Sequence, residues 1–258
     1  MSKPTISVIG AGNVATSLVP ALLKSGYPIK QLAARTEKNV KSLAIRHNLP
    51  YTTDITTISG QIIIICTNDN SIEKIAATLP SKPNQLVLHT AGSISLAAIS
   101  KYHAHCGVLY PLQTFSSERT ISFSEVPLCI EIYRKIDFEL INELATSLSG
   151  RVKTIDSSER LKIHTAAVFV CNFTNLMYSY GADIMENAGL NFEILRPLIE
   201  ETARKATMHN PKEVQTGPAL RMDTSTMEKH KKQLDAPMAE KYKVLSQWII
   251  DFFKPESR

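Results

Sequence analysis

Apolar and polar positions along the first half of the chain predict strands and helices in alternation. The apolar run at residues 5–9 predicts a buried strand, the 3.6-residue spacing over 14–24 predicts a helix that Gly26 ends, and 31–34 predicts a second strand. The run Ile62-Ile63-Ile64-Ile65 has no polar alternation, so we expect it to be buried on both faces, as parallel sheets covered by helices require.

Further segments extend the same pattern to about residue 155. We expect helices over 37–47, 71–79 and 137–149, and strands over 61–66, 85–89, 107–110, 128–133 and 151–155. The sequence therefore predicts the α/β fold class, with a doubly wound Rossmann domain over residues 1–155.

After Asp156 the spacing becomes helical and no strand is expected, so residues 156–258 predict an all-α domain. Asp156 with Glu159 and Ser225 with Glu228 have the spacing of capping boxes at helix starts. One helix is expected to run from 158 to about 187. Its middle, residues 166–171, is apolar on every side, which predicts burial in a bundle core or at a subunit interface.

Composition excludes several classes of protein. With 43% hydrophobic and 21% charged residues the chain is an ordinary globular one, and its net charge of +5 is scattered, so we expect no nucleic-acid partner. The four cysteines are far apart, which indicates free thiols and a cytoplasmic protein. We expect no signal peptide, no membrane span and no metal site.

The motif Gly10-Ala11-Gly12-Asn13-Val14-Ala15 lies where a strand should end and a helix begin. Gly10 permits the tight turn, Gly12 lets the backbone approach a pyrophosphate, and Ala15 allows close packing of helix and strand. We therefore expect residues 10–14 to bind a dinucleotide. The alternative is a glycine turn without a ligand.

The end of the second predicted strand carries Arg35 and Thr36, where NAD enzymes usually have an acidic residue. A guanidinium and a hydroxyl can bind a 2′-phosphate that a carboxylate would repel. The expected cofactor is therefore NADP(H). A solvated loop charge at Arg35 is the structural alternative.

Ligands of open α/β sheets bind beyond the carboxyl ends of the strands, which here are followed by polar residues. From these segments we expect cofactor contacts by Thr67, Asn68, Thr90 and Gly92. His89 is a candidate for polarising a substrate carbonyl. A structural role is equally open, in which a hydroxyl of this segment caps the next helix and His89 packs in the core.

Polar residues interrupt the apolar middle of the long predicted helix. His164 and Asn172 are candidate catalytic residues and Asn175 a candidate substrate contact. An ideal helix places His164 and Asn175 on nearly one face about 16 Å apart, with Asn172 about 80° away. The asparagines have a structural alternative, which is hydrogen bonding to neighbouring helices or a second subunit.

A turn between two predicted helices carries Arg221 and Asp223. Arg221 can clamp a substrate carboxylate or phosphate, so both residues are candidate substrate contacts. In the structural alternative, Asp223 caps the following helix and pairs with Arg221.

Taken together, these motifs resemble those of a bacterial family of oxidoreductases that have a Rossmann-like N-terminal domain and a C-terminal helical domain of unknown function. The likeness runs nearly end to end and rests on residues 10–15, 89–93, 110–115, 164–172 and 217–223. It implies that Gln113, in the Pro-Leu-Gln-Thr-Phe stretch, lies near the reactive end of the cofactor. Tyr110 stands where a histidine is often seen, and Met222 where a glycine is usual.

The architecture is more distantly similar to pyrroline-5-carboxylate reductase, ketopantoate reductase and the 6-phosphogluconate dehydrogenases. This likeness implies a homodimer formed through helical domains of the 6-phosphogluconate dehydrogenase type. The latter enzymes carry a catalytic Lys with an Asn four residues on, whereas Lys162 here is followed by Ala166. His164, supported by Asn172, is then the better candidate for the acid.

These patterns favour an NADP-dependent oxidoreductase that moves hydride between the nicotinamide and a small keto or imino acid in an interdomain cleft. His164 would donate the proton and Arg221 would hold the substrate anion. The rival hypothesis is a non-catalytic NADP(H)-binding sensor, which the missing Lys-Asn pair favours. A weaker third hypothesis gives the protein a flavin or deazaflavin as its hydride partner.

Overall fold

Two units make up the chain in a computed structural model that describes residues 2–116 and 121–254. Contacts divide the chain into Met1–Phe173 and Thr174–Arg258. The boundary predicted from the sequence, between residues 155 and 156, lies just before a helix that belongs to the first unit by its contacts. Each unit is described by itself below.

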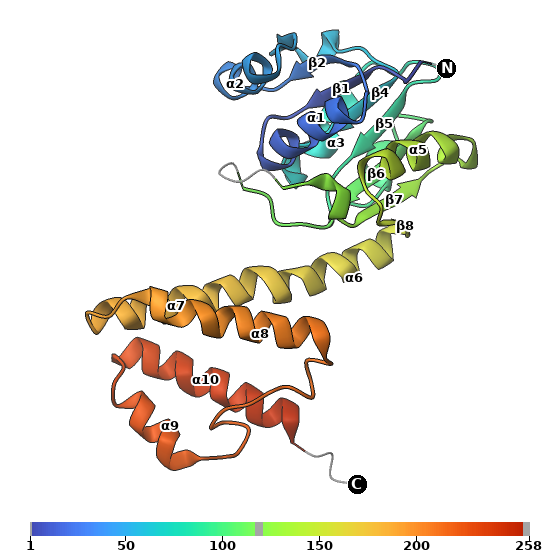
Figure 1. Ribbon diagram of the computed structural model, residues 1–258. Coiled ribbons are helices and arrows are strands. Elements are labelled where there is room, and N and C mark those ends of the chain that lie inside the picture. The colour runs from blue at the N-terminus through green and yellow to red at the C-terminus, as the bar shows by residue number, and fades with distance from the viewer. Residues whose placement is uncertain (1, 117–120, 255–258) are drawn as a thin grey trace. The chain divides into compact units, whose positions relative to one another are not determined.

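The first unit is built on an eight-stranded sheet in the order β3-β2-β1-β4-β5-β6-β7-β8 (Figure 1). Neighbouring strands are parallel except β6 and β7, which are antiparallel. The strands are β1 (Ile6–Ile9), β2 (Ile29–Ala33), β3 (Tyr51–Thr52), β4 (Ile62–Ile65), β5 (Leu86–His89), β6 (Cys106–Pro111), β7 (Leu128–Ile132) and β8 (Val152–Thr154).

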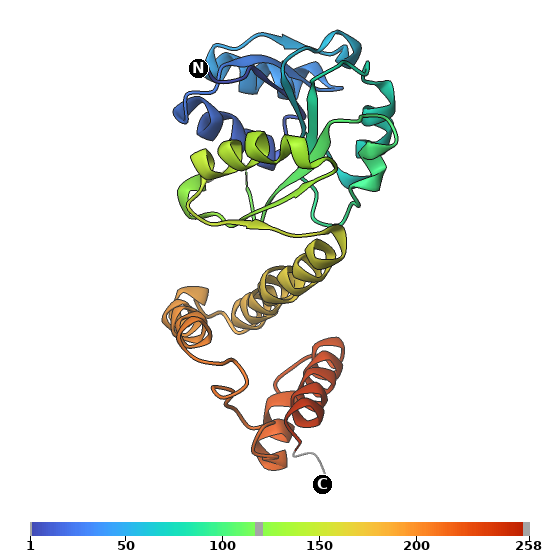
Figure 2. The ribbon, with the colours of Figure 1, turned by 90° about the vertical axis from the view of Figure 1, so that its right-hand side faces the viewer.

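Helices cover both faces of this sheet, which confirms the doubly wound α/β class (Figures 1 and 2). Ile62 and Ile64 pack with the helices on one face, and Ile63 and Ile65 with those on the other. The all-isoleucine strand is therefore buried on both sides, as its sequence predicts. One face carries α1 (Asn13–Lys24), α2 (Glu37–His47) and α5 (Phe138–Leu148), and the other carries α3 (Asp69–Thr78) and α4 (Ala97–Ser100).

Strand register determines which loops meet at the carboxyl edge of the sheet. Ile9 pairs with both Ala33 and Ile65, and Ile65 pairs with His89. The segments that follow β1, β2, β4 and β5 therefore emerge side by side, although up to 80 residues separate β1 from β5 along the chain. The sequence order of the strands reverses at β1 and β4, and ligands of such sheets bind at this point.

Helical residues run without interruption from Ser157 to Asn187, as predicted, but not as one α-helix. The run consists of α6 (Ser157–Ala167), a π-helical segment labelled η4 (Val168–Phe173), and α7 (Thr174–Asn187). Asp156 and Glu159 form the predicted capping box at its start.

The second unit is helical throughout its described secondary structure, as predicted. Its remaining helices are the 3-10 helix η5 (Phe192–Leu195), α8 (Arg196–Met208), α9 (Thr224–Lys231) and α10 (Ala236–Phe253). The predicted capping box at Ser225 and Glu228 is wrong, because Asp223 caps α9 by accepting a hydrogen bond from the Thr226 N–H at 3.0 Å. None of the helices described in residues 2–116 and 121–254 has the length and apolarity of a membrane span.

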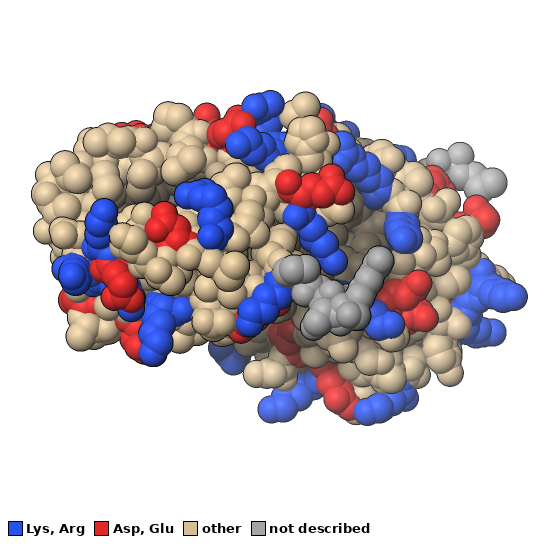
Figure 3. Space-filling view, turned by 90° about the horizontal axis from the view of Figure 1, so that it is seen from below, with Lys and Arg blue, Asp and Glu red and all other residues tan. Residues whose placement is uncertain are grey.

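Charges of both signs are mixed on the face of the molecule that Figure 3 shows. On the face shown in Figure 3, Lys and Arg side chains alternate with Asp and Glu and form no continuous basic area. On this face the net charge of +5 is not gathered in one place.

Met222 adopts a backbone conformation that disfavours its own side chain. Its φ is +54°, and its side chain is 68% exposed. A glycine has no Cβ to clash in this left-handed region, so Met222→Gly should raise the free energy of unfolding by roughly 0.5 to 1 kcal/mol. Met222→Ala, which keeps a Cβ, should not. Urea unfolding followed by the fluorescence of Trp248, the one tryptophan of the sequence, measures both.

Candidate active site

The turn between β1 and α1 accepts only glycine at its first position. Gly10 has φ +118°, and its N–H donates a hydrogen bond to the Ala33 carbonyl at 2.7 Å. A Cβ on Gly10 would lie 2.1 Å from the Cys66 carbonyl oxygen, at the end of the neighbouring β4. Gly10 is therefore required by the packing of β1 against β4.

Gly12 has a different role in the same turn. It is the N-cap of α1, and no side chain caps this helix end. A Cβ on Gly12 would meet no atom within 4 Å, so neighbouring protein atoms do not require the glycine. The uncapped N–H groups and open space suit the pyrophosphate of a dinucleotide, so these residues fit the predicted cofactor.

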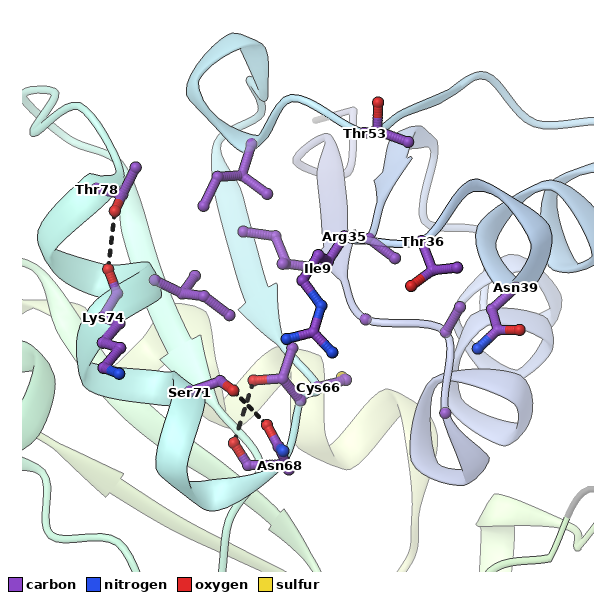
Figure 4. Close-up of a pocket in the computed structure, with 17 residues that line it drawn as sticks. Ile9, Arg35, Thr36, Asn39, Thr53, Cys66, Asn68, Ser71, Lys74 and Thr78 are labelled. Atoms are coloured by element: carbon purple, nitrogen blue, oxygen red, sulfur yellow. Dashed lines mark hydrogen bonds between the residues drawn. The ribbon is translucent and has the colours of Figure 1, made fainter.

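Beside this turn lies a cavity of about 520 Å³, here called the Arg35 cavity (Figure 4). Seven predicted cofactor residues line it: Gly10, Ala11, Gly12, Arg35, Thr36, Thr67 and Asn68. Sequence reasoning missed five polar residues that also line it: Asn39, Thr53, Ser71, Lys74 and Thr78. Ser71 and Lys74 lie three residues apart on α3, so the helical spacing of polar residues just after β4 was the available signal.

The charged residues of the Arg35 cavity are both cations. They are Arg35 and Lys74, and no carboxylate is among the described lining residues. Neither cation forms a hydrogen bond or ion pair through its side chain within the part of the chain that the structure describes. In Figure 4 the Arg35 guanidinium extends into the cavity towards the start of α3, where Asn68 and Ser71 lie. The cavity therefore presents positive charge to an anion.

A second cavity, of about 690 Å³, begins one residue beyond Gly12 and is called the His164 cavity. Its polar lining includes the predicted residues Asn13, Gln113, His164 and Asn172, together with Tyr110, Thr114 and Cys171. Val14, also predicted, contributes to its apolar lining. The Asn13 side-chain amide donates a hydrogen bond to the Phe115 carbonyl at 2.9 Å, which ties the glycine turn to the segment after β6.

His164 is paired with Tyr110 in this cavity. The Tyr110 hydroxyl lies 3.0 Å from His164 Nδ1, and the two rings meet edge to face with centroids 5.9 Å apart. A Cβ on Gly92 would lie 2.6 Å from His164 Nδ1 and 2.8 Å from Tyr110 Cζ. The predicted residue Gly92 therefore makes room for this pair and does not line either cavity.

A buried ion pair holds α6 against the sheet. Arg160 is 1% exposed and forms an ion pair with Glu131 of β7, and it donates a hydrogen bond to the Ile94 carbonyl at 2.5 Å. Ser157 Oγ donates to the same Glu131 carboxylate at 2.9 Å. His164 lies four residues after Arg160 and hence on the same helix face, so this anchor turns His164 towards Tyr110. Sequence reasoning missed Arg160.

The π-helical segment explains which asparagine shares the His164 cavity. A π turn holds more residues than an α turn, so residues after Val168 are rotated relative to an ideal α-helix. An ideal helix would put Asn175, not Asn172, near the face of His164, and the π segment changes this rotation. Asn172 lies within the π segment and lines the cavity with His164. Such segments are frequent at functional sites.

His89 and Thr90 line neither cavity. His89 is fully buried, and its Nδ1 accepts a hydrogen bond from the Ala91 N–H at 3.2 Å. Burial, with a smaller contribution from the Arg160 charge, lowers the pKa of His89 to about 3. Thr90 is also buried and donates to the Ile65 carbonyl at 3.4 Å. For His89, the packing role left open by the sequence fits this environment, because a fully buried imidazole cannot touch a substrate.

The remaining candidates, Asn175, Arg221 and Asp223, belong to the second unit. The Asp223 carboxylate caps α9, and this hydrogen bonding to Thr226 lowers its pKa. The capping role left open for Asp223 is thus the observed one. The substrate roles of Asn175 and Arg221 stay predictions. Across residues 2–116 and 121–254, no three His, Cys, Asp or Glu side chains gather where they could hold a metal.

The fold is of the Rossmann type, and comparison with family models agrees. Residues 5–92 match the family described as NADP oxidoreductase, coenzyme F420-dependent. Residues 126–249 match a family described as a domain of unknown function. No curated protein is significantly similar in sequence.

Solved structures extend the comparison to the whole chain. A Bacteroides fragilis protein described as a "putative NADP oxidoreductase" is 38% identical, with 97% of this chain and 99% of that chain covered and a TM-score of 0.89. The chain belongs to this family of NADP oxidoreductases, which confirms the resemblance inferred from the motifs. NADP(H) is accordingly the family's cofactor, as predicted.

More distant structures share the fold. A pyrroline-5-carboxylate reductase from Coxiella burnetii is 18% identical, with 98% of each chain covered and a TM-score of 0.59. An imine reductase from Pseudomonas sp. is 14% identical, with 98% of this chain and 93% of that chain covered and a TM-score of 0.66.

Burial of His89 predicts a pH-dependent stability. Unfolding exposes the imidazole and returns its pKa from about 3 to an ordinary value near 6.5, so the unfolded chain binds a proton that the folded chain does not. The free energy of unfolding should therefore fall by about 2 kcal/mol between pH 7 and pH 5 through this residue. Denaturant titrations of the wild type and His89→Asn at both pH values measure it. Equal falls in the two proteins would contradict the assignment.

Proposed function

We propose that the protein is an NADP(H)-dependent reductase that moves hydride between C4 of the nicotinamide and a small keto or imino acid. The observation that carries the proposal is the succession of two cavities along the glycine turn. The first presents unpaired cations and the second presents an imidazole. An extended dinucleotide can lie along such a path, with its phosphates at the start of α1.

In this proposal the Arg35 cavity binds the adenosine half of the cofactor. The open space over Gly12 and the uncapped start of α1 accept the pyrophosphate. Arg35 and Thr36 bind the 2′-phosphate through charge-assisted hydrogen bonds, and Lys74 adds positive charge from α3. The absence of a carboxylate among the described lining residues supports NADP(H) over NAD(H), whose ribose hydroxyls usually bind an acidic side chain.

The His164 cavity is the proposed place of reaction. Nicotinamide, when bound, supplies or accepts the hydride. His164 gives a proton to the oxygen or nitrogen of the reduced double bond, and Asn172 and Gln113 orient the reacting groups by hydrogen bonds. Apolar residues such as Val14, Leu112 and Ile163 line the same cavity and suit contact with the nicotinamide ring.

The names of two distant structural relatives support the substrate class. One is a pyrroline-5-carboxylate reductase and the other an imine reductase, and both names describe action on a carbon–nitrogen double bond. A small keto or imino acid presents the same kind of acceptor, with an oxygen or nitrogen that takes a proton as carbon takes hydride. An imidazole such as that of His164 suits that step.

Titration with the two dinucleotides tests the cofactor site. NADPH should bind at least tenfold more tightly than NADH, a difference of about 1.4 kcal/mol. Arg35→Asp should abolish the preference by repelling the 2′-phosphate, and Gly12→Val should abolish binding of both by filling the phosphate space. Calorimetry measures both dissociation constants for the wild type and the two variants. Lys30→Asp, at the amino end of β2, is the charge control.

The outcomes of this titration separate clearly. Loss of preference in Arg35→Asp but not in Lys30→Asp supports the proposed 2′-phosphate site. Equal affinity of the wild type for NADPH and NADH would contradict it. Failure of either dinucleotide to bind the wild type at millimolar concentration would overturn the cofactor site as a whole.

We also propose that the protein forms a homodimer through its helical unit. None of α7, α8, α9 and α10 contains a buried residue within the single chain. Large apolar side chains are exposed on this unit, among them Leu198 at 63%, Trp248 at 65% and Phe252 at 65%. A helical unit without a buried core of its own needs a further surface to cover its apolar side chains.

Light scattering tests the dimer directly. The mass in solution should be twice the 28.6 kDa of one chain. Trp248→Glu should shift the equilibrium towards the single chain, because it places a charge in the proposed interface. The substitution Lys30→Glu, in the first unit, is the control. A mass of 28.6 kDa for the wild type at micromolar concentration would contradict the proposal.

We also propose that the protein is located in the cytoplasm. All four cysteines are free, and Cys66, Cys106 and Cys129 are buried. Burial raises the pKa of the Cys66 thiol to about 12, so it remains a protonated, unreactive thiol. Such thiols are typical of proteins from reducing compartments.

A further inference from the structure

Tyr110 is placed to control the candidate proton donor. It lies near the end of β6, with 8% of its surface exposed, and faces His164 of α6. The distance of 3.0 Å between its hydroxyl and His164 Nδ1 is that of a hydrogen bond. Among the described residues, no other group bonds to this hydroxyl and none bonds to His164 Nε2.

The direction of this hydrogen bond follows from the two groups. Burial raises the pKa of Tyr110 to about 12, so the phenol keeps its proton at neutral pH. A buried O–H is stabilised by donating, and the acceptor within reach is the lone pair of a neutral imidazole at Nδ1. The neutral imidazole then carries its proton on Nε2.

We propose that Tyr110 is a positioning residue whose hydroxyl fixes the ring of His164 so that Nε2 is the nitrogen offered to the substrate. This inference rests on the proposed function, in which His164 is the proton donor. The hydroxyl selects which ring nitrogen of His164 faces the substrate. Without a partner the imidazole would exchange its two tautomers and flip its ring.

A hydroxyl serves both protonation states of the imidazole. When His164 is protonated, the Tyr110 hydroxyl rotates and accepts a hydrogen bond from Nδ1–H, and Nε2–H remains free for the substrate. As the carbon of the double bond receives hydride, the Nε2 proton passes to the oxygen or nitrogen of that bond. His164 is then neutral with its proton on Nδ1, and a proton from water restores the acid at Nε2. Tyr110 keeps its own proton throughout.

Packing around the pair restricts its motion. Any Cβ on Gly92 would approach His164 Nδ1 and Tyr110 Cζ to less than 3 Å, so the segment after β5 lies directly against both rings. The Arg160 anchor fixes α6 one turn before His164. The hydrogen bond is therefore made between two elements whose positions are already set, which favours a single ring orientation.

The tautomer of His164 in the protein without cofactor tests the inference. In ¹⁵N-labelled wild type, two-bond ¹H–¹⁵N correlation spectra above pH 8 should show His164 as the Nε2–H tautomer. In Tyr110→Phe, which removes only the hydroxyl, the His164 signals should shift towards a mixture of tautomers. The signals of His164 are identified as those that are missing from the spectrum of His164→Gln. Tyr133→Phe is the matched control, because Tyr133 is 58% exposed and outside the cavity.

Turnover provides the second readout. With a substrate found for the wild type, Tyr110→Phe should lower kcat tenfold or more while the Kd for NADPH stays within about twofold. Tyr133→Phe should change none of these.

Several results would overturn the role of Tyr110. They are an Nδ1–H tautomer in the wild type, an unchanged tautomer in Tyr110→Phe, or an equal loss of NADPH affinity, kcat and thermal stability, which would indicate general structural damage. Absence of turnover in the wild type with every keto and imino acid would instead contradict the proposed function. The tautomer measurement would still decide the role of Tyr110.

Discussion

The buried ion pair between Arg160 and Glu131 is the interaction on which the geometry of the site depends. It joins the first turn and a half of α6 to β7, and Ser157 adds a hydrogen bond to the same carboxylate. Two charges removed from water are costly unless they are paired and hydrogen bonded, and here the Ile94 carbonyl also accepts from Arg160, whose Nε alone has no partner among the described residues. Removing either partner would leave the other charge buried and unpaired, so α6 has one stable position on the sheet. That position brings His164 to Tyr110.

The other fixed element of the site is the glycine turn at the carboxyl edge of the sheet. Gly10 lets β1 lie against β4, while Gly12 leaves room that the protein itself does not use. Gly10 is thus required by the packing of the protein, whereas Gly12 leaves space that a ligand can occupy. Because β1, β2, β4 and β5 end in register, Arg35 and the segments after β4 and β5 meet around this turn without long loops.

Local sequence was sufficient wherever a short segment determines its own conformation. The glycine turn, the capping box at Asp156 and the two-sided burial of Ile62 to Ile65 follow from residue type and spacing, and the structure agrees with each. Seven residues of the Arg35 cavity were identified in this way, because their strands end at a common edge. Arg35 was identified by its charge at a position that normally holds an acid.

Features that depend on contacts between distant segments were not accessible to the same reasoning. Lys74 lines the cavity because of how α3 sits on the sheet, and only its spacing from Ser71 after β4 gave a sign of this in the sequence. The π segment that brings Asn172 beside His164 departs from the ideal helix on which the geometry was predicted. The partner of Arg160 lies 29 residues away, and His89 is buried where it pairs with β4 and β6 in the sheet. From residue type alone, a histidine is as compatible with an active site as with a buried position in the core.

The proposed function requires one dinucleotide to span both cavities of the first unit, and a crystal structure of the NADPH complex would test this. We expect the 2′-phosphate on Arg35, the pyrophosphate over Gly12, and the nicotinamide ring in the cavity of His164 and Tyr110. A nicotinamide bound elsewhere, or a phosphate that avoids both Gly12 and Arg35, would contradict it.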